Sequence, residues 1–127
     1  MDRRLISSGS PFEERIGFSR ALRVGDRVIV SGTAPVLPDG GCPEQAGDQA
    51  RRCYEIIEQA LAEAGASLGD VVRTRQYIVD RADADAVMDA HRACFSHVRP
   101  ASTMILAAGF LDPRWRVEIE AEAVVRG

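Results

Sequence analysis

The sequence has few of the residues that build disulfide or metal sites. Three of its 127 residues are cysteines, Cys42, Cys53 and Cys94, and no two of them are spaced as CxxC. An odd number without that spacing predicts neither a disulfide framework nor a zinc site, and it is typical of a reducing compartment. We therefore predict a cytoplasmic protein without a structural metal.

Long apolar segments and an excess of basic charge are also missing. No window approaches the ~18 apolar residues of a membrane span, and no apolar stretch follows the arginines near the amino terminus, as a signal peptide would require. Sixteen basic and 19 acidic residues give a net charge of −3 and a pI of about 5.4. Such a chain does not attract a polyanion, so we expect neither a membrane nor a nucleic acid as partner.

What the chain does contain is enough apolar residues for one core. Hydrophobic residues make up 46% of it and charged residues 28%, a balance that excludes a wholly disordered chain. A chain of this length is expected to bury roughly two-thirds of the surface that it exposes when unfolded. We predict a single domain over residues 1–127.

Hydrophobic periodicity predicts the order of the elements. Alternating or β-branched segments predict strands at 3–7, 20–24, 27–31, 71–79, 103–107 and 116–125. Apolar residues at helical spacing predict helices over 44–64 and 83–95, whereas the polar stretch 7–17 and the Pro- and Gly-rich segment 34–43 are expected to be turn and loop. The order βββαβαββ indicates an α+β fold, a mixed sheet with two helices packed on one face. The other face must then meet water or another subunit.

The last predicted strand carries a row of carboxylates. Its residues alternate strictly, so Glu118, Glu120 and Glu122 share one face. Carboxylates about 7 Å apart repel one another unless nearby cations offset their charge. Arg73 and Arg75 form a basic pair on another predicted strand. One interpretation is a solvated face with ion pairs. The other is a cleft in which one glutamate acts as acid or base.

Other catalytic patterns are absent or weak. The sequence contains no GxGxxG, Walker, HExxH or GxSxG motif, and His91 and His97 do not share a helical face, so no metal site is expected. Ser102 and Thr103 follow Pro100 at the entry to a strand, where hydroxyls and main-chain donors hold small carboxylates in many proteins. A solvated turn is the alternative interpretation.

Several segments are informative when they are read together: GFSRA at 17–21, VSGT at 30–33, GDVVRT at 69–74, RPAST at 99–103 and VEIEA at 117–121. In this order they resemble the Rid/YjgF family of reactive-intermediate (imine and enamine) deaminases. The resemblance implies a chorismate-mutase-like α+β fold and a homotrimer with a ligand cleft at each subunit interface. It also implies hydrolysis of 2-iminobutanoate or 2-iminopropanoate to a 2-oxo acid and ammonia, without metal or cofactor.

The same resemblance implies roles for individual residues. Glu120 corresponds to the glutamate that positions the attacking water, and Gly32 to the glycine whose main chain lies against the ligand. Phe18 stands where the family has a tyrosine and keeps an apolar wall without the hydroxyl.

One position departs from the family pattern. The deaminase turn reads P-A-R, and its arginine, which grips the substrate carboxylate, corresponds here to Ser102. A neutral hydroxyl cannot supply a charge-assisted bond of typically ~1.5–3 kcal/mol. We expect Ser102 and Thr103 to line the substrate site, with Arg75 or Arg99 as candidates to replace the missing cation.

These observations leave three functions open. The first is a Rid-like hydrolase acting on small imines, enamines or related C–N compounds. The second is a non-catalytic trimer of the same family that binds a small carboxylate or regulates a partner enzyme. The third, ribonuclease activity, is a label also used for the family, and the acidic pI disfavours it.

Overall fold

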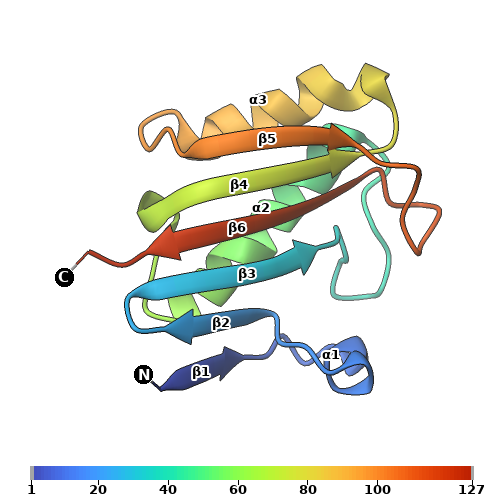
Figure 1. The fold of residues 1–127 in the computed structure, drawn as a ribbon. Coiled ribbons are helices and arrows are strands. Elements are labelled where there is room, and N and C mark those ends of the chain that lie inside the picture. The colour runs from blue at the N-terminus through green and yellow to red at the C-terminus, as the bar shows by residue number, and fades with distance from the viewer. Residues whose placement is uncertain (1, 127) are drawn as a thin grey trace.

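Six strands form one mixed sheet in the computed structural model, which describes residues 2–126 (Figure 1). In chain order they are β1 (Arg3–Ile6), β2 (Ala21–Val24), β3 (Arg27–Thr33), β4 (Val71–Ile78), β5 (Ala101–Leu106) and β6 (Val117–Val124). Across the sheet the order is β1-β2-β3-β6-β4-β5, with antiparallel neighbours except for the parallel pair β4 and β5. The closing strand β6 is therefore internal, and β1 and β5 are the edges.

Both long helices, α2 (Ala46–Glu63) and α3 (Ala84–Phe95), cover the same face of this sheet (Figure 1). Helix α3 makes the crossover that the parallel strands β4 and β5 require, and short 3-10 turns at Leu68–Asp70 and Arg81–Asp83 precede β4 and α3. No helix within residues 2–126 is long and apolar enough to cross a lipid bilayer. The predicted α+β sheet with two helices on one face is confirmed.

A third helix corrects the prediction of a simple turn. Helix α1 (Pro11–Ile16) follows β1. Ser10 caps its start, where its side chain accepts a hydrogen bond from Phe12 N, and Gly17 caps its end with a φ of 92°. Only Glu13 of its side chains is buried. Such a short helix has no repeated apolar stripe, and that stripe is the signal by which periodicity reveals a helix.

The core lies between the sheet and the two long helices. It is filled by alternate strand residues and one stripe of each helix, with the largest fully buried apolar side chains being Phe95, Ile57, Leu61, Ile78, Ile119, Val28, Val30, Val87 and Val117. Cys53 is wholly buried on the α2 stripe, where burial raises the pKa of its thiol far above the ordinary value. A thiol in this setting packs as a small hydrophobic group and is not a nucleophile.

A buried glutamine joins two irregular segments at one end of the sheet. Gln49 on α2 donates to Pro43 O at 2.7 Å and to Arg114 O at 3.0 Å, and its Oε1 accepts from Arg116 N at 2.7 Å. The loop at 34–43 and the segment that leads into β6 are therefore held to α2 and to each other. This end of the sheet is also where β3 ends and β6 begins (Figure 1).

Candidate active site

The face that the helices leave uncovered carries the row of carboxylates. Along β6, buried residues alternate with the half-buried Glu118, Glu120 and Glu122. The register with β4 places Glu120 opposite Arg75 and Glu118 opposite Tyr77. Because β6 is internal, each carboxylate has neighbours on β3 as well as on β4, and these neighbours make the three positions unequal.

Two of the three carboxylates are held by cations. Glu120 Oε1 lies 2.8 Å from Arg75 Nη1 and accepts a hydrogen bond from the Tyr77 hydroxyl at 3.2 Å. Glu122 lies 3.5 Å from Arg27 and 3.9 Å from Arg75. Partial burial and the nearby Glu120 raise the pKa of Tyr77, which keeps its hydroxyl a donor. The interpretation as a face with ion pairs is right for these two positions.

Glu118 differs from its two neighbours. In the part of the chain that the structure describes, it forms no ion pair and its side chain takes part in no hydrogen bond. Burial raises the pKa of Glu118, with Arg20 opposing and Glu120 adding to the rise. A β-carbon at position 32 would lie 3.4 Å from Glu118 Oε1, so Gly32 leaves room at this carboxylate. A half-buried carboxylate with a raised pKa is suited to acid–base chemistry.

Arg20 is the cation beside Glu118. The next residue, Ala21, is buried on the helix side, so Arg20 lies on the uncovered face. Its Nη2 donates to Gly32 O at 2.6 Å, and its guanidinium carbon lies 5.6 Å from the centre of the Phe18 ring. Burial lowers the pKa of Arg20 while the charges of Glu13 and Glu118 oppose that shift, and a guanidinium remains ionised in such surroundings.

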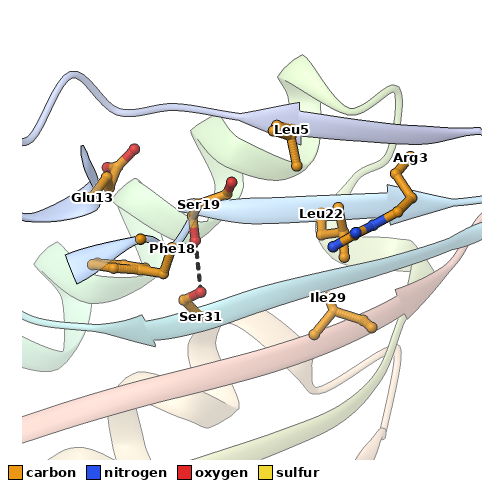
Figure 2. Close-up of a pocket in the computed structure, with 9 residues that line it drawn as sticks. Arg3, Leu5, Glu13, Phe18, Ser19, Leu22, Ile29 and Ser31 are labelled. Atoms are coloured by element: carbon orange, nitrogen blue, oxygen red, sulfur yellow. Dashed lines mark hydrogen bonds between the residues drawn. The ribbon is translucent and has the colours of Figure 1, made fainter. Parts of the chain in front are cut away.

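The uncovered face is hollowed beside Phe18, against whose ring Arg20 lies (Figure 2). A cavity of about 550 Å³ lies over β1, β2 and β3 and is lined in part by Phe18, Ser19, Leu22, Ile29 and Ser31. Ser31 Oγ donates to Ser19 O at 2.7 Å at its edge. A smaller hollow of about 150 Å³ lies over β3, β6 and β4 and also reaches Ile29 and Ser31. The two hollows therefore meet along β3.

The structure brings most of the predicted site residues to this face. Phe18 lines the larger hollow, Gly32 contacts the Arg20 side chain, and Arg75 and Glu120 line the smaller hollow. Thr103 lies on the edge strand β5 in register with Arg75. Sequence reasoning did not single out Arg20 or Tyr77, because each gains its place from pairing with strands that are distant along the chain.

Ser102 lies on the opposite face of the sheet. Strand β5 begins at Ala101, two residues earlier than predicted, and pairs Ser102 with Thr74, which is fully buried. Thr74 Oγ1 donates to Ser102 Oγ at 2.8 Å and lies 2.8 Å from His91 Nε2 on α3. Within this chain Ser102 completes a polar cluster at the helix layer and does not face Glu120.

Arg99 lies in the turn between α3 and β5. Its φ of 56° is the left-handed conformation usually left to glycine, and its N–H donates to Phe95 O at 2.9 Å. No hydrogen bond or ion pair within residues 2–126 ties its side chain to the carboxylate row. The described residues also contain no group of three His, Cys, Asp or Glu side chains that could hold a metal ion.

The fold and this face define a small α+β protein with a carboxylate cleft on an uncovered sheet. The chain belongs to the Rid/YjgF family, described as Endoribonuclease L-PSP, whose profile matches residues 10–125. The crystal structure of Rv2704 from Mycobacterium tuberculosis, a member of the YjgF/YER057c/UK114 family, is similar with a TM-score of 0.90 and 40% identity, covering 98% of this chain and 100% of that one. The predicted family is confirmed.

Two further relatives bear on ligands. The 2-iminobutanoate/2-iminopropanoate deaminase of Salmonella typhimurium is 32% identical over 86% of this chain and 88% of its own length. TdcF of Escherichia coli, whose crystal structure contains bound serine, is similar with a TM-score of 0.81 and 26% identity, over 97% of this chain and 94% of that one. Each similarity covers most of this chain.

Proposed function

We propose that this protein hydrolyses small 2-imino acids to 2-oxo acids and ammonia in the cleft on the uncovered face. The observation that carries the proposal is Glu118, a half-buried carboxylate with a raised pKa and no partner within the described chain, beside which Gly32 carries no side chain. Hydrolysis of an imine requires a group that removes a proton from water as the water attacks, and such a carboxylate can do so. The similarity to the Salmonella deaminase supports this choice of substrate.

The proposed reaction has two steps. In the first, Glu118 takes a proton from water as the oxygen bonds to the imine carbon, the C=N electron pair moves to the nitrogen, and Glu118 returns the proton to that nitrogen. In the second, Glu118 takes the hydroxyl proton of the resulting carbinolamine and returns it to the amino nitrogen, so that the C=O bond forms as the C–N bond breaks and ammonia leaves. A carboxylate whose pKa is raised above the ordinary value can both accept and return a proton, so one residue serves both steps. Glu120, which Arg75 and Tyr77 hold in place, is the second candidate for this role.

The direct test uses 2-iminopropanoate formed in situ from alanine by an amino acid oxidase. We expect added protein to speed the loss of the imine in proportion to its concentration, with 2-oxopropanoate and ammonia as products. No acceleration with either 2-iminopropanoate or 2-iminobutanoate would contradict the proposal. Stabilisation by 2-oxo acids in the absence of turnover would instead favour the non-catalytic, carboxylate-binding alternative.

We also propose that the uncovered face is closed by other copies of the chain in a homotrimer, the assembly typical of the family. Apolar side chains are exposed on this face, with Leu5 66%, Ile29 39% and Ile105 39% accessible. Burying such side chains is the usual driving force for association. Sedimentation equilibrium should give three times the mass of one chain, and Ile29→Asp should shift it toward one. A wild-type protein that sediments as one chain would contradict the trimer.

A further inference from the structure

The chemistry of a 2-imino acid limits where its carboxylate can bind. The carboxylate is bonded directly to the carbon that water attacks. A cation that holds it must therefore lie close to the base that activates the water, within about two hydrogen-bond lengths, ~6 Å. This inference rests on the proposed function, since it asks which residue holds the acid group of that substrate.

The arginines of β3 and β4 do not meet this requirement for Glu118. Arg75 is already paired with Glu120 and contacts Glu122, and Arg27 is paired with Glu122. Arg73 is in register with Glu122, four residues along β6 from Glu118, which at about 3.3 Å per residue is roughly 13 Å away. A substrate carboxylate held by any of them would lie over Glu120 or Glu122 and not over Glu118.

Arg20 and Glu118 both adjoin Gly32, and the charge of each shifts the pKa of the other. Arg20 donates to Gly32 O at 2.6 Å, and Gly32 is the residue whose missing side chain leaves space at Glu118. Within residues 2–126 Arg20 forms no ion pair, and its Nε is buried without a hydrogen-bond partner. A guanidinium has five N–H donors in a planar fork that matches a carboxylate. Gly32 O and the Phe18 ring thus hold the Arg20 guanidinium in place, and further N–H groups of this guanidinium remain to bind a ligand.

We propose that Arg20 binds the carboxylate of the substrate and makes the cleft selective for 2-imino acids over neutral imines. The substrate then lies with its acid group toward β2 and its imine carbon in front of Glu118. Its alkyl group would point along β3 into the larger hollow, toward the apolar Leu22 and Ile29 (Figure 2).

The test compares pyruvate with pyruvamide, a neutral analogue of nearly the same shape, as inhibitors of imine hydrolysis and as ligands in a thermal-shift titration. The wild type should bind pyruvate roughly 10- to 100-fold more tightly than pyruvamide, as expected for a charge-assisted pair. Arg20→Gln should bind the two alike and raise KM for 2-iminopropanoate by about the same factor, with a smaller change in kcat. Arg20→Lys, which keeps the charge, should retain part of the preference.

Arg23→Gln is the matched control. Arg23 lies on β2, three residues after Arg20, but faces the helices, where its Nη1 donates to Ala64 O at 2.7 Å, so its loss should leave the preference for pyruvate unchanged. Arg20→Gln protein that still prefers pyruvate would overturn the inference, as would wild-type protein that hydrolyses imines without binding pyruvate. Absence of imine hydrolysis by a wild type that does prefer pyruvate would reject the proposed function and leave the assignment of Arg20 standing.

Discussion

Glu118→Gln should lower kcat/KM for imine hydrolysis by about 10²–10⁴-fold, the usual effect of removing a general base. Glutamine keeps the size of the side chain but cannot accept the proton of the attacking water. Glu120→Gln is the matched variant on the same strand, and it should cost much less, because Glu120 is occupied by Arg75 and Tyr77. A larger loss of kcat/KM in Glu120→Gln than in Glu118→Gln would identify Glu120 as the general base instead.

The pH dependence of kcat/KM provides a second measurement of this assignment. Glu118 must be ionised to accept a proton, and burial raises its pKa above the ordinary value of 4.5. The rate should therefore fall with decreasing pH along a limb whose midpoint lies above 4.5, and the residual activity of Glu118→Gln should lack that limb. Removing the Arg20 charge should move the limb further up, because Arg20 favours the ionised carboxylate.

The raised pKa of Glu118 also predicts the stability of Glu118→Gln, so that a loss of activity can be distinguished from a loss of folding. A carboxyl group with a higher pKa in the folded than in the unfolded state binds its proton more tightly when folded. Its contribution to stability is present below pH 4.5 and is lost as the pH rises through the folded pKa. At neutral pH, Glu118→Gln should therefore unfold at the same or a higher urea concentration than the wild type. A large drop in stability would contradict the half-buried, unpaired state of Glu118.

Phe95→Ala should reduce the free energy of unfolding by about 3–5 kcal/mol, the usual cost of removing a buried phenylalanine. Phe95 is 2% exposed, and its ring centre lies 5.5 Å from that of Tyr54 and 4.7 Å from that of His91. The loss would leave a cavity where α2, α3 and the turn into β5 meet. Against a total of 5–15 kcal/mol typical of small domains, this is a major fraction.

Urea unfolding measures that effect, and Met88→Ala on the same helix provides its control. Met88 is 50% exposed, so its truncation should change the free energy of unfolding by less than about 1 kcal/mol. Equal midpoints for the two variants would show that the end of α3 is not anchored in the core as the structure describes.

Local sequence patterns predict the fold well because each pattern repeats within one element. The strict alternation of 116–125 identifies β6 and its two faces, and the apolar stripes of 44–64 and 83–95 identify α2 and α3. The prediction fails where no repeat exists, as at α1. Local patterns also did not indicate on which face of β5 Ser102 lies, because a shift of a single residue exchanges the two faces of a strand.

The sequence by itself determined the family, the order of the two long helices and the strands, and the presence of a carboxylate row on the face away from the helices. These features follow from periodicity and from motifs within short segments. Only the tertiary structure distinguished Glu118 from Glu120 and Glu122, and only it placed Arg20 beside Glu118. The physical reason is that the partners and the burial of a side chain depend on strands brought together from distant parts of the chain, and no local pattern records which strands become neighbours.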